Sequence, residues 1–206
     1  MPFIDNDFKI TTSIQVRRIL MTTADDSLVY KAAENLAYFL QNQGQSILLV
    51  DGDLGNGPNE NKPLTKVLDD KAAIAKAVKK MRHLAILGGK SEISLAQNSD
   101  VFKKQFLSDL QLYEENYDRT ITAIESNNID LQNLWLTWAD KTFLFFQNES
   151  LSMEKTAEFL STHPNQICGL IGTNPNPHET RLAWMRLKEV IPDTPELVLD
   201  IKKIAL

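Results

Sequence analysis

The chain alternates between short apolar runs and longer amphipathic stretches, most clearly in its first quarter. Residues 16–23 are typical of a short strand, and residues 46–50 (SILLV) form a continuous apolar run, as in a parallel strand buried on both faces. Between them, residues 27–44 place apolar side chains at the helical spacing and end at Gly44, a natural C-terminal stop. This order predicts a β-α-β unit with a right-handed crossover.

The same alternation continues along the rest of the chain. We expect helices over 64–81, 100–116, 152–163 and 178–191, strands over 83–87, 119–124, 141–147 and 166–174, and a loop over 55–63. Strands that alternate with helices indicate an α/β fold, with a mostly parallel central sheet and helices on both of its faces. Because single α/β domains reach this length, we expect residues 1–206 to form one domain.

The C-terminal segment, residues 196–206 (ELVLDIKKIAL), leaves two alternatives open. Apolar side chains at Leu197, Leu199 and Ile201 alternate as in a closing edge strand. The same residues with two lysines would suit a short amphipathic helix that binds a partner or, weakly, a membrane surface.

Composition and charge narrow the function classes. The net charge of −5 and the pI near 5.3 do not favour a nucleic-acid binder. Cys168 is the one cysteine; it fits a reducing compartment, and its place in an apolar run predicts an inert, buried thiol. No apolar run approaches the ~20 residues of a membrane span, and residues 1–18 contain no apolar signal-peptide core, so we expect a cytoplasmic protein. The dispersed His83, His163 and His178 predict no metal site.

Polar residues follow three of the predicted strands at the end where α/β proteins bind ligands. They lie in 22–31 (TTADDSLVYK), 51–53 (DGD) and 172–177 (GTNPNP). Asp51 and Asp53 are either caps of the following turn or contacts to a ligand or partner. Other positions leave similar alternatives: a helix cap at Asp25–Asp26, a turn or a nucleotide-base contact at Asn174, and a core or an exposed binding edge at Trp135 and Trp138.

Residues 16–56 (VRRILMTTADDSLVYKAAENLAYFLQNQGQSILLVDGDLGN) resemble the opening of the MinD/ParA-type deviant P-loop (SIMIBI) ATPases, with MinD and the flagellar-number regulator FlhG closest. The tyrosine autokinases of bacterial polysaccharide export are near relatives. ENLAYFL and LLVDGDLGN match well, and looser matches follow in the family's order over residues 16–192. The resemblance implies the P-loop fold, with a site for ATP and magnesium at the strand ends.

The phosphate-binding loop departs from the family. Alignment back from residues 35–37 (NLA) places the P-loop lysine on Val29, the magnesium-binding Ser/Thr on Tyr30 and the signature lysine near Ala24. No glycine lies within residues 22–31. Glycines let such a loop bring its backbone N–H groups close to phosphate, so this loop is degenerate.

The charges of the site also depart from the family. Asp25 and Asp26 fall where phosphate oxygens would lie, and like charges repel. Lys31 comes two residues late, about 200° round the helix from the lysine position. The Walker B acid is replaced by Ala123, which leaves Glu125 as the candidate for a shifted substitute.

The sequence therefore favours a non-catalytic MinD/FlhG-like pseudo-ATPase that regulates or scaffolds a bacterial cell-surface assembly, such as polysaccharide or cellulose secretion, a flagellum or a pilus. We expect no ATP or magnesium cofactor, no catalytic residues, and a protein partner that is a second copy or an active MinD/ParA-like paralogue, with any inner-membrane association made through partners. Two alternatives remain: a divergent active NTPase that uses Lys31 and Glu125, and an unrelated α/β metal-dependent phosphohydrolase. The vestigial nucleotide-site positions are Asp25, Asp26, Val29, Tyr30, Lys31, Asp51, Asp53 and Asn174.

Overall fold

The computed structural model describes residues 16–25, 29–53, 74, 77–81, 83–88, 99–125, 128–174 and 176–200. Seven strands form one sheet in the order β3-β4-β2-β5-β1-β6-β7. Neighbouring strands are parallel except for the antiparallel pair β3 and β4, which confirms the mostly parallel sheet. The strands are β1 (Arg18–Thr23), β2 (Ile47–Asp51), β3 (Val78–Met81), β4 (Leu84–Leu87), β5 (Arg119–Ala123), β6 (Lys141–Phe146) and β7 (Ile167–Gly172).

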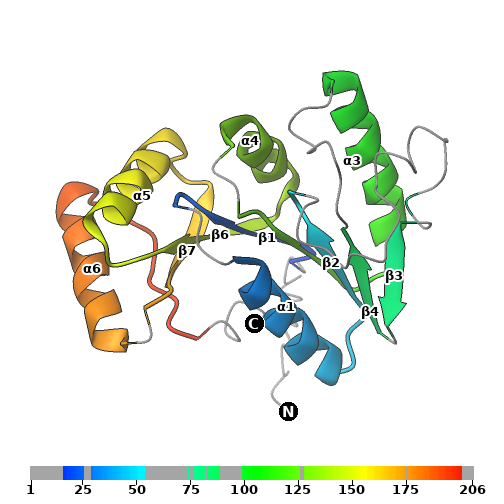
Figure 1. Ribbon diagram of the computed structural model, residues 1–206, viewed down its shortest axis with the longest axis horizontal. Coiled ribbons are helices and arrows are strands. Elements are labelled where there is room, and N and C mark those ends of the chain that lie inside the picture. Colours follow the sequence, from blue (N-terminus) through cyan, green and yellow to red (C-terminus); the bar gives the residue numbers. More distant parts are fainter. Residues whose placement is uncertain are drawn as a thin grey trace, which may run out of the picture.

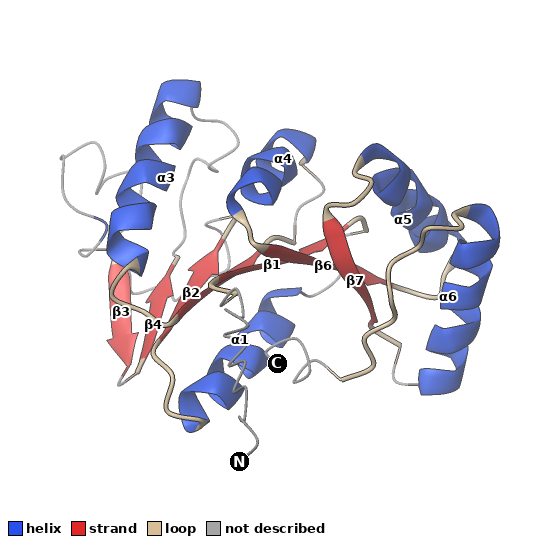
Figure 2. Ribbon diagram, turned by 180° about the vertical axis from the view of Figure 1, so that it is seen from behind, coloured by secondary structure: helices blue, strands red, loops and turns tan. Residues whose placement is uncertain are grey.

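Helices cover both faces of the sheet. The helices α3 (Asp100–Glu114), α4 (Ile129–Trp138) and α5 (Ser150–Thr162) lie on one side and α1 (Val29–Asn42) on the other, while α6 (Pro177–Val190) lies beside α5 at the β7 end (Figures 1 and 2). Two apolar clusters reflect this layering: the side chains of α3 to α6 join one cluster and those of α1 the other. The predicted α/β architecture with helices on both faces is confirmed.

The structure corrects two predicted elements. Residues 78–81 were expected at the end of a helix, but they form β3, because pairing with β4 along the sheet edge overrides their helical pattern. The rest of that predicted helix, apart from residues 74 and 77, and the predicted loop over 55–63 lie outside the described residues. Conversely, the sequence predicted no element where α4 forms.

The apolar pattern of α4 is interrupted, because the helix buries the polar Gln132 and exposes the apolar Ile129. Its start is fixed by Asn128, whose side-chain oxygen accepts a hydrogen bond from the Leu131 N–H at 2.9 Å. Trp135 and Trp138 are buried and contact each other edge to face. Their core alternative is therefore confirmed.

Cys168 is exposed, so the prediction of a buried thiol is wrong. The pairing of β6 with β7 runs from Thr142 opposite Ile167 directly to Phe143 opposite Gly169, which leaves Cys168 as an extra residue in a bulge. A bulge turns a side chain away from the direction that strict alternation predicts. Cys168 lines a depression of about 310 Å³ beside the end of α5.

The start of the C-terminal segment pairs with the edge of the sheet. The Leu170 N–H donates to the Glu196 carbonyl and the Val198 N–H donates to the Leu170 carbonyl, both at 2.8 Å, in a parallel bridge. This pairing agrees with the edge-strand alternative as far as residue 198. Residues 201–206 lie outside the described part of the chain.

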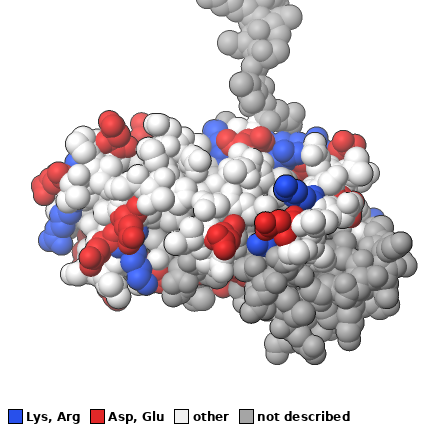
Figure 3. All heavy atoms as spheres, turned by 90° about the horizontal axis from the view of Figure 1, so that it is seen from above, with Lys and Arg blue, Asp and Glu red and all other residues white. Residues whose placement is uncertain are grey.

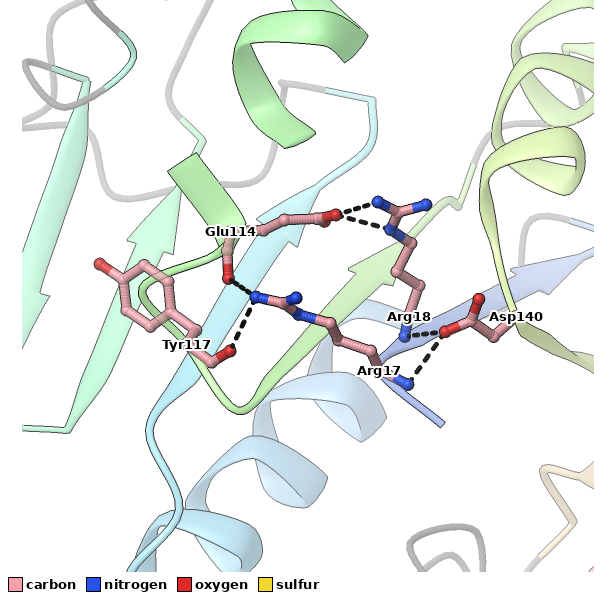
Figure 4. A network of polar contacts seen from close by, with 5 residues as sticks. All are labelled: Arg17, Arg18, Glu114, Tyr117 and Asp140. Carbon is pink, nitrogen blue, oxygen red and sulfur yellow. Dashed lines mark hydrogen bonds and ion pairs between the residues drawn. The ribbon is translucent and has the colours of Figure 1, made fainter. Parts of the chain in front are cut away.

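Charged side chains fix the amino ends of the central strands (Figure 4). Arg18 forms an ion pair with Glu114, with its Nε 2.6 Å from Glu114 Oε1, and its guanidinium lies 5.3 Å from the Trp138 ring centre. Arg17 Nη2 donates to the Glu114 carbonyl at 2.9 Å. The backbone N–H groups of Arg17 and Arg18 donate to Asp140 at 2.9 and 2.8 Å. These contacts join β1 to the C-terminal ends of α3 and α4.

The charges on one face are mixed in sign. Figure 3 looks onto the side that carries α3, α4 and α5, where the acidic and basic side chains of the described residues are interspersed. The described part of this face therefore presents no extended basic surface of the kind that binds nucleic acid.

Candidate functional site

The candidate site lies at the carboxyl ends of β2, β5 and β1, which are neighbours at the centre of the sheet. In their parallel pairing, Ala123 at the end of β5 lies opposite both Asp51 of β2 and Met21 of β1. This register places the segments that follow the three strands side by side. The structure therefore brings together two of the three predicted segments, the DGD turn and the described start of 22–31, with Ile124 and Glu125 after β5. The third predicted segment, 172–177, begins at the end of β7, which β6 separates from β1.

The turn after β2 is held close against β5. The Gly52 N–H donates to the Ala123 carbonyl at 2.7 Å. A Cβ atom on Gly52 would lie 2.7 Å from Ile124 Cγ1 and 2.9 Å from the Ala123 carbonyl oxygen, so only glycine fits. The buried Asp51 accepts a hydrogen bond from the Asp53 N–H at 3.2 Å, which is the turn-capping contact that one reading predicted.

Asp53 and Glu125 extend these contacts to the helix α1. Asp53 Oδ2 accepts from the Glu125 N–H at 2.6 Å. Glu125 Oε1 in turn accepts from the Tyr30 N–H at 2.8 Å. A row of hydrogen bonds therefore runs from the end of β2 through the end of β5 to the first turn of α1. The sequence named all of these residues but did not predict that they bind one another.

Val29 and Tyr30 hold the positions that the resemblance gives to the P-loop lysine and the magnesium-binding hydroxyl. Val29 is 0% exposed and packs in the apolar cluster beneath α1. Burial raises the pKa of the Tyr30 hydroxyl well above its usual range, and the negative charges of Asp51 and Glu34 raise it further. These two positions therefore hold an aliphatic side chain and a bulky phenol in place of the lysine charge and the small hydroxyl that the resemblance implies.

Lys31 lies on the solvent side of α1. Its side chain is 71% exposed, and its Nζ lies 2.5 Å from Glu34 Oε2, one helical turn further along. This hydrogen bond and the negative charge of Glu34 raise the pKa of Lys31. The Lys31 side chain therefore points to solvent, which agrees with the predicted rotation away from the P-loop lysine position.

Asp25 contacts the last residue of β1 and a residue of α5. Thr23 Oγ1 donates to Asp25 Oδ1 at 2.5 Å, and the Ser152 hydroxyl donates to Asp25 Oδ2. Ser152 also accepts from the Gln147 N–H at 2.9 Å, which ties the loop to the end of β6. Asp26 and Leu28, which belong to the predicted helix cap at Asp25–Asp26, lie outside the described residues.

Two residues of α4 fix the loops of the site, and the sequence did not identify either role. Gln132 Nε2 donates to the Thr23 carbonyl at 2.8 Å, and Trp135 Nε1 donates to the Gly52 carbonyl at 3.3 Å. A buried glutamine inside an apolar stretch was the available signal, since a buried amide needs hydrogen-bond partners. Ser152 carried no comparable signal.

Asn174 is engaged in the turn before α6. Its Oδ1 accepts from the Asn176 N–H at 2.8 Å, and its Nδ2 donates to Glu179 Oε2 at 2.9 Å. Asn176 then caps α6 by accepting from the His178 N–H at 3.0 Å. These contacts agree with the turn alternative for Asn174.

Within the described residues, no three His, Cys, Asp or Glu side chains are grouped so that they could hold a metal ion. The described helices also include none that is long and apolar enough to cross a membrane.

The comparisons with known proteins place this geometry in a common fold. No protein-family model and no curated protein matches the chain. Among solved structures, it is similar to the MinC:MinD cell division protein complex of Aquifex aeolicus (TM-score 0.64, 15% identity, 87% of this chain and 79% of the other). A ParA family ATPase from Chlorobium tepidum (0.66, 13%, 90% and 85%) and cobyrinic acid a,c-diamide synthase from Mycobacterium smegmatis (0.63, 16%, 84% and 81%) are also similar.

The similarity covers most of each chain, at an identity too low to carry over an activity. It supports the α/β fold with a mostly parallel sheet described above. The chain therefore has the fold of the MinD/ParA P-loop ATPases.

Proposed function

We propose that this chain is a non-catalytic protein of the MinD/ParA fold, a pseudo-ATPase that acts by binding another protein. The observation that carries the proposal is Val29, a fully buried aliphatic side chain at the position that the resemblance gives to the phosphate-binding lysine. Phosphoryl transfer depends on cations placed around the transferred group. Lys31 is the one basic residue within 22–31, and it lies on the solvent side of α1, paired with Glu34.

The acidic groups around the loop support the same proposal. Asp25, Asp51, Asp53 and Glu125 lie at the strand ends, and their negative charges oppose the approach of a triphosphate. These carboxylates bind hydroxyl and N–H groups of the chain, so their described contacts build the loops.

Calorimetric titration of the purified chain with Mg-ATP tests the proposal. We expect no binding tighter than about 1 mM and no phosphate release above the buffer rate. The same titration of Lys31→Ala separates the alternative of a divergent NTPase. Tight binding in the wild type that Lys31→Ala abolishes would establish that alternative and contradict ours.

For the protein partner, we propose a second copy or an active MinD/ParA-like paralogue in a bacterial cell-surface assembly. Ile129 and Leu151 support a protein contact at this edge: they are 65% and 63% exposed and lie at the starts of α4 and α5, beside the candidate site. The Aquifex neighbour is itself a complex of MinD with another protein, MinC.

Light scattering tests this contact by measuring the molar mass of the chain alone and in a mixture with an active MinD/ParA-like paralogue from the same organism. We expect the double variant Ile129→Asp/Leu151→Asp to weaken association by at least about tenfold. Val101→Asp is the matched control, because Val101 is exposed on α3. Equal effects of the two changes would place the contact elsewhere.

A further inference from the structure

The first turn of α1 already has an anion bound to it. Tyr30 is the second residue of α1, and its N–H is one of the four at a helix start that have no partner within the helix. The carboxylate of Glu125 accepts from this N–H at 2.8 Å. A helix start attracts negative charge, and in P-loop proteins that charge is a phosphate.

Glu125 is held in place by the strand ends around it. Its own N–H donates to Asp53 Oδ2 at 2.6 Å, and Asp53 is joined to the buried Asp51. The preceding residue, Ile124, is fully buried, and its N–H donates to the Met21 carbonyl at 2.9 Å. The backbone at Ile124 and Glu125 is therefore held by β1 and by the turn after β2, so the carboxylate is preorganised for the helix start.

We propose that Glu125 is a built-in anion that takes the place of a phosphate at the start of α1. It satisfies the Tyr30 N–H, sets the start of α1 without a ligand, and closes this position to external phosphate. The inference rests on the proposed function, because a chain that no longer binds nucleotide needs another group to satisfy this helix start.

Amide hydrogen exchange at Tyr30 tests the inference on the full chain. In Glu125→Ala we expect exchange of the Tyr30 N–H to be at least about tenfold faster than in the wild type. Sodium formate, which supplies a small free carboxylate, should restore part of the protection, whereas sodium chloride of equal ionic strength should not. Glu34→Ala is the control: Glu34 lies on the same helix but binds Lys31, so Tyr30 exchange should stay unchanged.

An unchanged Tyr30 exchange rate in Glu125→Ala would overturn the inference. Slower Tyr30 exchange in the wild type on addition of about 10 mM inorganic phosphate, enough to occupy a site of millimolar affinity, would also overturn it. If Glu125→Ala does not fold, Glu125→Gln gives the comparison, because it keeps an acceptor oxygen and removes the charge. We expect its exchange to be about threefold faster, and an unchanged rate contradicts an anionic role.

The two proposals fail in different ways. ATP hydrolysis by the wild type contradicts the proposed function, whatever the exchange rate of Tyr30. Unchanged exchange in Glu125→Ala, without hydrolysis by the wild type, removes the built-in anion and leaves the proposed function in place.

Discussion

The two ends of the central strands hold their buried carboxylates in different ways. At the amino end, Glu114 is 1% exposed and faces the guanidinium of Arg18. At the carboxyl end, Asp51 is equally buried, and it begins a row of carboxylates that bind backbone N–H groups. An arginine cancels a full charge, whereas N–H dipoles satisfy the oxygens and leave the negative charge in place. The amino end thus pairs a buried carboxylate with a cation, whereas the carboxyl end uses carboxylates to join backbone segments of the loops.

The largest expected effect comes from breaking the ion pair at the amino end. Arg18→Leu leaves the Glu114 carboxylate buried without its cation and removes the guanidinium from the Trp138 ring. We expect the free energy of unfolding to fall by about 3–5 kcal/mol. Urea denaturation at pH 7 measures this loss. Lys31→Ala is the control, because its ion pair is exposed on α1 and screened by solvent, so we expect a much smaller loss than for Arg18→Leu.

The pH dependence of the stability of Arg18→Leu tests whether the loss comes from the buried charge of Glu114. Burial raises the pKa of Glu114, and the hydrogen bond and charge of Arg18 lower it again. Without Arg18 the pKa of Glu114 rises further above its unfolded value, so the folded state binds the proton more tightly. The loss of stability should therefore shrink as the pH falls through the folded pKa of Glu114. A loss that is the same at pH 5 and pH 7 would trace to packing alone.

A smaller effect is expected from the carboxyl end when its charges are left intact. Gly52→Ala forces the turn away from Ile124 and should cost about 1–3 kcal/mol. Because the turn carries Asp53, the displacement should also loosen Glu125 and speed hydrogen exchange at Tyr30. Gly44→Ala is the matched control. It meets no atom within 4 Å but has φ of 86°, so we expect a cost of about 1 kcal/mol and unchanged Tyr30 exchange.

The contrast also separates what sequence could predict from what it could not. The strands β2 and β5 and the helix α1 were predicted because each is a local pattern of apolar residues. The direction of Lys31 was predicted because helical geometry alone fixes it. The end of the predicted 64–81 helix was wrong because β3 exists only through its partner β4.

The contacts of the site depend on pairings between distant residues. Glu125 lies 95 residues from Tyr30 and 72 from Asp53, and its role follows from the register of β5 between β1 and β2. Cys168 was misjudged because one extra residue in β7 reverses the direction that alternation gives. Sequence therefore supplied the carboxylates and the α1 residues of the site but not the roles of Gln132, Trp135 and Ser152, and the sheet register determined the partners.

The smallest expected effect lies at the amino end, at the exposed carboxylate of Asp118. Replacing it shows how much a carboxylate contributes to stability there without burial. Asp118 Oδ2 accepts from the Ser46 N–H at 2.7 Å and from the Ser46 hydroxyl at 2.8 Å. The backbone hydrogen bond is the main cause that lowers the pKa of Asp118, followed by the hydroxyl.

A lowered pKa means that the unfolded chain binds the proton more tightly, so this stability is present above the unfolded pKa and is lost as the pH falls through the folded pKa. Asp118→Asn should cost about 0.5 kcal/mol at pH 7, because solvent screens the exposed group, and the difference from the wild type should vanish once the pH has fallen below the folded pKa of Asp118. Asp109→Asn on α3 is the control, because its described partner is the neutral Gln105 amide. A cost at pH 7 as large as that of Arg18→Leu would show that the stability of the amino end depends on the hydrogen bonds of its carboxylates and not on their burial.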